Sequence, residues 1–147
     1  FQQLYRIIPK TIIKIKRGEI LELHGKGRGM RDFININDLN NALYILLLKG
    51  KIGESYNIAN KNKIISIYNL VKLICNILKV INWEGNIKLV NENYGQDSMY
   101  FLNTNKIRKL GWNEKISLEK GIKKTILWIN NNWKLIEKMP HEYVHKK

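Results

Sequence analysis

The sequence predicts a mixed α/β domain, and three observations support this fold class. Stretches with apolar residues three or four positions apart, the spacing of one helix face, alternate with short apolar runs suited to strands. A length of 147 residues is typical of one domain with its own hydrophobic core. With 44% hydrophobic and 26% charged residues, the composition is that of an ordinary globular protein.

The chain is predicted to begin with a helix and a strand. Over Ile7–Arg17 apolar residues recur at helical spacing, Pro9 falls in the first turn, and Gly18 ends the helix. Residues 20–24, "ILELH", alternate between apolar and polar side chains, which predicts a strand that leads into a glycine-rich loop.

A second strand and a second helix are predicted after this loop. Residues 33–36, "FINI", form the expected strand. Asp38 is then predicted to cap a strongly apolar helix over 39–49, which ends at Gly50.

The middle of the chain continues the alternation. Residues 54–60, "ESYNIAN", predict a buried strand, and Ser66 is predicted to cap a helix over 67–79. Residues 86–90, "NIKLV", predict one more strand.

Two helices are predicted in the last third of the chain. Thr104 is expected to cap a short helix over 104–110 that Gly111 stops. From 118 to about 131 apolar residues again recur at helical spacing, and the helix is expected to resume after the asparagines that follow. Residues 138–147 are predicted to fray.

The net charge of +14 suggests nucleic-acid binding at first sight, but its distribution argues against it. Residues 1–60 carry 10 basic and 5 acidic residues, 61–116 carry 9 and 4, and 117–147 carry 7 and 3. No segment concentrates the cations into a stripe. The 24 Ile, 21 Lys and 19 Asn are instead typical of an AT-rich genome.

The residue types that carry most enzyme chemistry do not form a recognisable constellation. The single cysteine, Cys75, lies on an apolar helical face and is predicted to pack in the core of a protein from a reducing compartment, the cytoplasm. His141 and His145 are predicted to be solvated, and no histidine has the spacing of a metal ligand. Trp112 and Trp128 are predicted to be core residues. No stretch approaches the roughly 18 apolar residues of a membrane span.

One stretch has the composition of a phosphate-binding loop: residues 25–33 read "GKGRGMRDF". Dinucleotide-binding folds place such glycines between a strand and a helix whose N-terminus receives the pyrophosphate. Here the glycines lie between two predicted short strands, so the stretch is not the start of a doubly wound nucleotide fold.

Six segments in order resemble the C-terminal half of the extended short-chain dehydrogenase/reductases, in particular the dTDP-glucose 4,6-dehydratases. They are "RIIPK" (6–10), "GKGRGMRDF" (25–33), "NDLNNAL" (37–43), "GESYNIAN" (53–60), "LVNENYGQDSMYFLNTNKIRKLGW" (89–112) and "GIKKTILW" (121–128). The resemblance implies a small mixed α/β substrate-binding subdomain over 1–137, without most or all of the N-terminal Rossmann sheet. It places NAD and the catalytic Tyr-x-x-x-Lys pair in that N-terminal half, so no catalytic residue is expected here.

The resemblance also implies a function for the glycine-rich stretch. Gly25, Gly27, Arg31, Asp32 and Phe33 match the family pattern Gly-x-Gly-x-x-x-Arg-Asp-Phe, in which the arginine contacts the diphosphate of a nucleotide sugar. A guanidinium makes forked, charge-assisted hydrogen bonds to phosphate oxygens, and glycines allow a close approach of the backbone. The alternative for Arg31 is a salt bridge with Asp32 or with Asp38.

Further substrate contacts follow from the same resemblance. Leu23 and His24 are expected beside the ribose or base, and Arg6 is expected to keep a positive charge near the diphosphate. A second phosphate segment usually reads Arg-Pro-x-x-Asp-x-Arg-Tyr. Here Asp97 matches, but Asn93 stands in place of the first arginine, and the second is also missing.

The implied whole enzyme is an NAD-dependent lyase that oxidises C4 of the hexose, eliminates water across C5–C6 and returns the hydride to C6. It would act as a homodimer on a nucleotide-diphosphate sugar. Two alternatives remain open: a nucleotide-sugar 4-epimerase of the same family, and a non-catalytic remnant or binding module for a nucleotide or nucleic acid. An isolated subdomain would also leave apolar surface uncovered, so we expect the chain alone to self-associate.

Overall fold

The computed structural model describes residues 2–61, 63–91 and 98–142. Its longer helices are α1 (Ile7–Arg17), α2 (Ile36–Lys49), α3 (Ile67–Leu78) and α5 (Leu118–Asn131), and its one-turn helices are α4 (Asn105–Arg108) and α6 (Trp133–Ile136). Its strands are β1 (Leu21–Leu23), β2 (Met30–Arg31), β3 (Ile65–Ser66) and β4 (Ile87–Leu89). Two 3₁₀ turns, η1 (His24–Gly27) and η2 (Trp83–Asn86), precede β2 and β4. The predicted mixed α/β class is confirmed.

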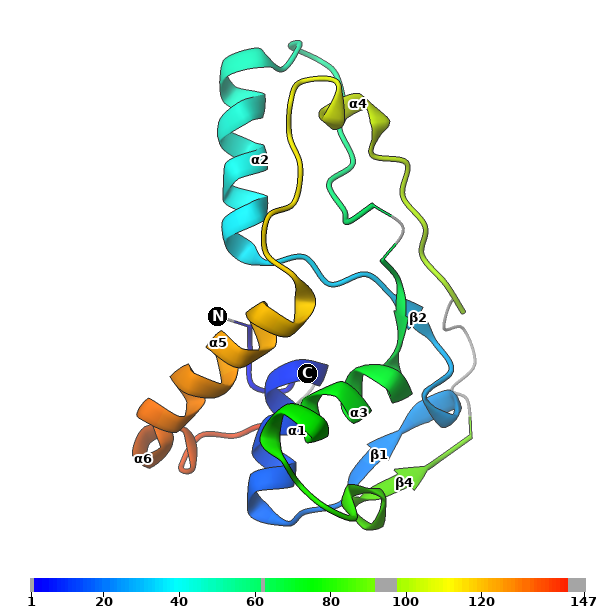
Figure 1. Ribbon diagram of the computed structural model, residues 1–147, viewed down its shortest axis with the longest axis vertical. Helices are drawn as coiled ribbons and strands as arrows, with labels where there is room; N and C mark the ends of the chain where they lie inside the picture. Colours follow the sequence, from blue (N-terminus) through cyan, green and yellow to red (C-terminus); the bar gives the residue numbers. More distant parts are fainter. Residues whose placement is uncertain (1, 62, 92–97, 143–147) are drawn as a thin grey trace, which may run out of the picture.

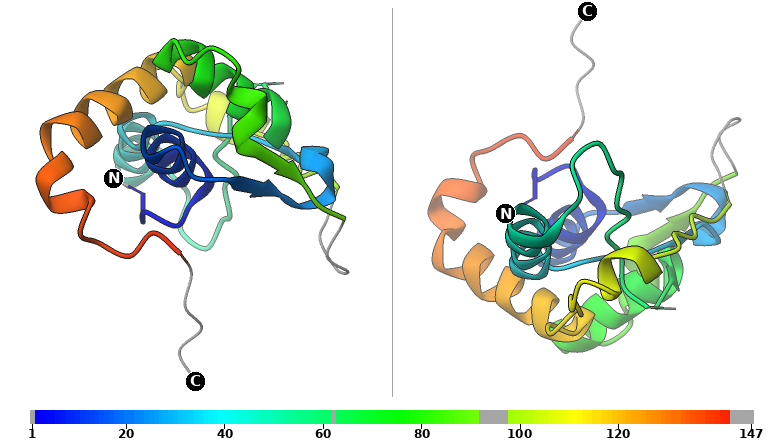
Figure 2. Two further views of the ribbon diagram at one scale, coloured as in Figure 1. Left: turned by 90° about the horizontal axis from the view of Figure 1, so that it is seen from below. Right: turned by 90° about the horizontal axis from the view of Figure 1, so that it is seen from above.

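Helices α1, α3 and α5 pack together around the main core (Figures 1 and 2). The amphipathic patterns predicted in the sequence supply its fully buried residues, because each helix turns its apolar stripe toward the other two. They include Ile12 and Ile13 of α1, Leu70 and Ile74 of α3, and Ile122 and Ile129 of α5.

The strands form two small ladders beside these helices. β1 pairs in parallel with β4, with Leu21 opposite Ile87, and β2 pairs antiparallel with β3, with Arg31 opposite Ile65. The inward side chains of β1 join a second core cluster that also contains Cys75 and Trp83. The buried position predicted for Cys75 is confirmed.

Helix α2 extends away from this body, alongside the segment that links α4 to α5 (Figure 1). A third cluster joins the two, formed by Ala42 of α2, Ile107 of α4 and Trp112. Trp112 is fully buried, and its indole Nε1 donates a hydrogen bond to the backbone oxygen of Asp38 at 3.0 Å. The core position predicted for Trp112 is confirmed.

Helix ends followed the predicted signals where the signal was local. The αL residue Gly18 ends α1, and the hydroxyl of Ser66 accepts from the backbone N–H of Asn69 at the start of α3. Ser117, which was not among the predicted caps, caps α5 in the same way. The chain becomes helical again at Trp133, as expected.

Two predicted strands are wrong. Residues 33–36 and 54–60 are not strands in the structure. Helix α2 begins at Ile36, three residues earlier than expected, because the side chain of Asn35 accepts from the backbone N–H of Asn37 and caps it. The side chain of Asp38, predicted as the cap, instead accepts from backbone groups of a distant segment.

Two smaller predictions also need correction. Thr104 stands at the N-terminus of α4, but its side chain makes no capping bond there and accepts from Arg108 Nε at 2.9 Å. His141 was predicted to be solvated, but its side chain is only 14% exposed. Its ring nitrogens lie 3.0 Å from Arg17 Nη1 and 3.1 Å from Glu19 Oε2. His145 lies outside the described residues.

None of the helices in the part of the chain that the structure describes is long and apolar enough to cross a membrane.

Candidate functional site

A cavity of about 180 Å³ opens where three segments distant in the sequence meet. It is lined by Arg31, Asp32, Ile34, Ile58, Ala59, Asn60, Ile64, Tyr100, Phe101 and Leu102. Apolar side chains and an aromatic pair supply most of this lining, and a few polar groups lie among them. A mostly apolar lining with a few placed polar groups is the usual chemistry of a small-molecule site.

Arg31 is the cationic residue among these lining residues, and β2 holds it in place. Its guanidinium carbon lies 4.7 Å from the centre of the Tyr100 ring, and its Nη1 donates to the backbone oxygen of Met30 at 2.8 Å. The strand is fixed on both sides, because Met30 N donates to Ser98 O at 2.8 Å and the other edge pairs with β3. Arg31 is therefore a half-buried cation stacked on an aromatic ring at the cavity wall.

The two carboxylates predicted as alternative partners of Arg31 accept hydrogen bonds from other groups. Asp32 accepts from the backbone N–H of Asn60 at 2.7 Å and from its Nδ2 at 2.5 Å. Asp38, buried at 4% exposure, accepts from the backbone N–H groups of Lys115 and Ile116 at 3.1 and 2.9 Å. Among the described residues no ion pair joins Arg31 to Asp32 or Asp38, so the predicted salt-bridge alternative is not what the structure shows.

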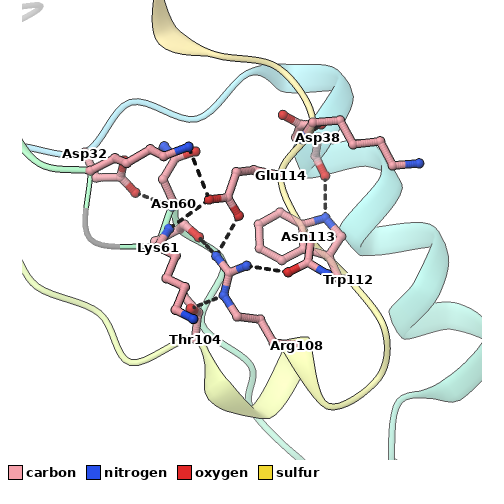
Figure 3. A network of polar contacts seen from close by, with 12 residues as sticks. Asp32, Asp38, Asn60, Lys61, Thr104, Arg108, Trp112, Asn113 and Glu114 are labelled. Atoms are coloured by element: carbon pink, nitrogen blue, oxygen red, sulfur yellow. Dashed lines mark hydrogen bonds and ion pairs between the residues drawn. The ribbon is translucent and has the colours of Figure 1, made fainter.

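A network of polar contacts behind the cavity fixes residues 59–61 (Figure 3). Arg108 donates to Glu114 Oε2 at 2.7 Å, to Asn113 Oδ1 at 2.8 Å and to the backbone oxygen of Ala59 at 3.3 Å. Glu114 also accepts from the backbone N–H of Lys61 at 3.1 Å. The cavity wall at Asn60 is thus anchored on both sides by one ion pair.

Opposing effects act on the pKa of Glu114. Burial raises the pKa. Hydrogen bonds from Arg108 and from backbone N–H groups, together with the charge of Arg108, lower it by more than burial raises it, so the net shift is downward. The carboxyl group is therefore held as a carboxylate in the folded protein.

Three backbone N–H groups of the glycine-rich turn are bonded within the protein. The N–H groups of Gly25, Lys26 and Arg28 donate to backbone oxygens of Asn91, Val90 and Gly25. Gly27, at φ +69°, packs so closely on α3 that a Cβ there would lie 3.0 Å from Tyr68 Cβ. These glycines allow tight packing between β1 and β2, and Arg31 is the cation of this stretch that lines the cavity.

The structure separates the other predicted site residues. Leu23 is 2% exposed within the second core cluster, so its side chain presents no surface to a ligand. His24 is exposed at the start of η1, and Gly25 is buried beside it. Arg6 is exposed at the N-terminus of α1, where it contacts Tyr5 and Gln3, and it does not line the cavity. Asn93 and Asp97 lie outside the described residues.

Sequence reasoning missed several lining residues. The contact of Tyr100 with Arg31 joins residues almost 70 positions apart, and sequence spacing gives no sign of it. Asn60 was assigned to a strand, and its contact with Asp32 joins positions that are 28 apart in the sequence. Phe101 and Leu102 directly follow Tyr100, and this run of three large apolar residues was the signal that the sequence offered for a binding surface. All three are exposed in the structure.

The described residues contain no cluster of three His, Cys, Asp or Glu side chains that could hold a metal ion. Burial raises the pKa of the Cys75 thiol to about 11, and the nearby Glu84 adds to this. Cys75 is therefore an inert core thiol.

Comparison with known proteins identifies the family. Residues 2–125 match the sequence profile of the family described as GDP-mannose 4,6 dehydratase. An Arabidopsis thaliana enzyme, described as trifunctional UDP-glucose 4,6-dehydratase/UDP-4-keto-6-deoxy-D-glucose 3,5-epimerase/UDP-4-keto-L-rhamnose-reductase, is 37% identical over 127 residues, which are 86% of this chain and 19% of that enzyme. The human dTDP-D-glucose 4,6-dehydratase is 35% identical over 140 residues, 90% of this chain and 40% of that enzyme.

A solved structure shows the same fold. The dTDP-glucose 4,6-dehydratase of Bacillus anthracis, in complex with NAD, superposes with a TM-score of 0.82 at 28% identity. The match covers 92% of this chain and 42% of that enzyme. The chain thus spans less than half of each of these relatives. The match to the family profile covers most of the chain, and the chain belongs to the GDP-mannose 4,6-dehydratase family.

Proposed function

We propose that this chain is the nucleotide-sugar-binding portion of an NAD-dependent nucleotide-sugar 4,6-dehydratase, in which Arg31 binds the diphosphate of the substrate. The observation that carries the proposal is the position of Arg31, half-buried and stacked on Tyr100 at the wall of a cavity. Family membership supports the substrate class, and the dehydratase relatives support the reaction.

The chemistry of the cavity suits a diphosphate. A guanidinium is charged at every physiological pH and offers several N–H donors in one plane, so it can bind two phosphate oxygens at once. The contact with Tyr100, in which the guanidinium carbon lies 4.7 Å from the ring centre, helps to hold the side chain at the cavity wall. Partial burial strengthens the attraction because fewer water molecules screen it.

The size of the cavity limits what these residues bind by themselves. Sites for drug-sized ligands usually enclose about 300–1,000 Å³. A cavity of about 180 Å³ is smaller, so it suits the diphosphate and part of the adjoining group. The remainder of the substrate would be enclosed by other residues of the whole enzyme. We retain His24, Arg6, Asn93 and Asp97 as proposed contributors, within a binding domain over 1–137.

NAD fits the residues described here poorly. A dinucleotide requires a glycine turn whose N–H groups face the pyrophosphate at the start of a helix. The glycine turn of this chain connects two strands, and the N–H groups of Gly25, Lys26 and Arg28 are bonded to backbone oxygens. We therefore assign NAD to the part of the enzyme beyond this match, and we assign no residue of this chain to hydride transfer.

The 4,6-dehydratase reaction is preferred over 4-epimerisation because the relatives described above have dehydratase activity in their names. Product analysis by NMR separates the two reactions: a 4-keto-6-deoxy sugar supports the dehydratase, and a hexose inverted at C4 supports the epimerase. We further propose that the whole enzyme is cytoplasmic and that it is a homodimer. Analytical ultracentrifugation of the full-length protein would test the dimer.

Titration calorimetry of the full-length protein with dTDP and UDP tests the binding proposal. Loss of a charged hydrogen bond costs about 1.5–3 kcal/mol, so Arg31→Ala should weaken binding of the preferred nucleotide by about 10- to 150-fold. Arg28→Ala is the matched control, because Arg28 lies in the same loop but does not line the cavity. Absence of binding to the wild-type protein would refute the proposal and favour a non-catalytic remnant.

A further inference from the structure

Two separate segments of the chain form most of the cavity. Residues 58–60 form the first wall, and residues 100–102 form the second wall. The structure describes both stretches, and neither is in a helix or a strand. No ladder of backbone hydrogen bonds therefore sets the spacing of these two described walls, as it does between paired strands. Their spacing depends instead on the contacts that side chains make.

Arg108 connects the two walls (Figure 3). Helix α4, which carries this residue, begins shortly after the second wall. The Nε of Arg108 donates to Thr104 Oγ1 at 2.9 Å, and its Nη2 donates to the backbone oxygen of Ala59, in the first wall, at 3.3 Å. Because the guanidinium is planar and rigid, it holds these two acceptors at a fixed separation.

Glu114 extends the connection along the first wall. Its Oε2 accepts from Arg108 Nη2 at 2.7 Å, and its Oε1 accepts from the backbone N–H of Lys61 at 3.1 Å. Arg108 and Glu114 together thus hold the residues on either side of Asn60. Asn113 Oδ1 accepts from Arg108 Nη1 at 2.8 Å and fixes the remaining edge of the guanidinium.

Two further bonds between the same segments are exposed to water. Lys106 Nζ donates to the backbone oxygen of Ser55 at 2.9 Å, and Asn57 Nδ2 donates to the backbone oxygen of Asn103 at 3.3 Å. Water competes with bonds of this kind, whereas the side chain of Arg108 is only 13% exposed. Arg108 therefore supplies a connection that water displaces less easily.

We propose that Arg108 is a positioning residue for the cavity: together with Glu114 it sets the separation at which the two walls enclose part of a nucleotide sugar. This proposal rests on the proposed function of the cavity. Arg108 is not among the lining residues, so the role requires no contact between Arg108 and the ligand. Walls that are already held in place lose less conformational freedom when a ligand binds, and this favours affinity.

The first test is Arg108→Gln in the full-length protein, with dTDP-glucose and UDP-glucose as probes in titration calorimetry. Gln lacks the rigid fork that joins the walls, so we expect affinity for the preferred probe to fall about tenfold. Lys106→Gln is the matched control, because it removes a cation of the same helix whose bonds are exposed. It should leave affinity unchanged. Equal affinities of Arg108→Gln and wild type would overturn the proposal.

Arg108→Lys separates positioning from a purely structural role. Lys keeps a positive charge beside Glu114, but its single ammonium group lacks the planar fork that reaches both Thr104 and Ala59. We expect its stability in urea unfolding to be closer to wild type than that of Arg108→Gln, while its affinity stays about tenfold below wild type. If affinity recovers to the wild-type value, the fork has no positioning role and the proposal is overturned.

Gly18→Ala controls for stability alone. Gly18 ends α1 in a left-handed conformation outside the cavity, so the variant is less stable although the walls are untouched. Unchanged affinity of this variant supports the proposal, and a loss equal to that of the Arg108 variants overturns it. If Arg108→Gln does not fold, the comparison of Arg108→Lys with Gly18→Ala still decides. Failure of the proposed function gives a different result, because the wild-type protein would then bind neither probe.

Discussion

Arg108 and Glu114 form an ion pair that also bonds to the backbone of residues in the cavity wall. Their side chains are 13% and 10% exposed, so both charges are largely withdrawn from water. Such a pair contributes little net stability compared with apolar residues, but loss of one partner leaves the other charge uncompensated. Because the pair also holds Ala59 and Lys61, its geometry fixes one wall of the cavity.

The pair makes a testable prediction about acid stability. The pKa of Glu114 is lower in the folded protein than its usual value, so its contribution to stability is complete above the unfolded-state pKa. That contribution is lost as the pH falls through the folded-state value. We expect Glu114→Gln to be less stable than wild type at neutral pH and to lose less stability on acidification, measured by urea unfolding from pH 7 to pH 3. Parallel pH profiles for the two proteins would contradict this assignment.

Asp38 gives a second prediction at the residue scale. Its carboxylate accepts two backbone N–H groups of the segment before α5, and the site is almost fully buried. Asp38→Ala leaves both donors unsatisfied, and we expect it to lower the free energy of unfolding by about 2–3 kcal/mol. Asp38→Asn is the matched control, since its amide oxygen still accepts one of the bonds. If the two variants are equally stable in urea unfolding, the carboxylate has no such role.

At the scale of elements, the helices were predictable and the strands largely were not. Helix α3 carries its own signals, with an apolar stripe and Ser66 as a cap, and its predicted start and approximate end are confirmed. The strands are only two or three residues long, and their existence depends on partners far away in the sequence. Residues 54–60 have the composition of a strand but find no partner strand, and they have no regular secondary structure where they meet the polar network.

The candidate site was likewise predictable only where its signals are local in the sequence. Arg31 could be selected because a local motif surrounds it, and the structure places it at a cavity. Its orientation could not be predicted, because Tyr100 and Asn60 reach the cavity only through the fold. Leu23 illustrates a different case: a family correspondence suggests a position beside the ribose or base, and strand alternation places its side chain in the core.

The junction between the glycine turn and α3 gives a prediction at the element scale. Gly18 and Gly27 have nearly the same φ, +68° and +69°. A Cβ at 18 would meet nothing within 4 Å, whereas one at 27 would lie 3.0 Å from Tyr68. Gly18→Ala should therefore cost about 1–2 kcal/mol for the left-handed conformation alone. Gly27→Ala should cost about 1 kcal/mol more, because α3 must also shift. Equal costs in urea unfolding would show that the contact with Tyr68 is not tight.

At the scale of the whole molecule, the fold has two parts with separate apolar clusters. The body formed by α1, α3 and α5 has a continuous core, whereas α2 extends from it on the smaller third cluster (Figure 1). The outer face of α2 is apolar and exposed: Leu43, Tyr44, Leu47 and Leu48 are between 52% and 81% exposed. Exposed apolar patches of this kind are unusual on a stable monomer and mark contact surfaces.

This face predicts the behaviour of the chain in isolation. The match covers at most 42% of the chain of each relative described above, so other parts of those enzymes are available to cover such a surface. Without that cover, burial of apolar area is worth about 25 cal/mol per Å², and we expect the chain to self-associate through α2. Light scattering at increasing protein concentration measures this directly, and a monomer over the full range would contradict the prediction.

Matched charge substitutions locate the surface responsible. Leu43→Lys with Leu47→Lys places two cations on the exposed face of α2 and should shift the scattering mass toward the monomer. Leu127→Lys with Leu135→Lys adds the same charge at exposed leucines of α5 and α6. If α2 is the contact surface, only the first pair reduces association. If both pairs reduce it equally, charge repulsion explains the effect and α2 has no special role.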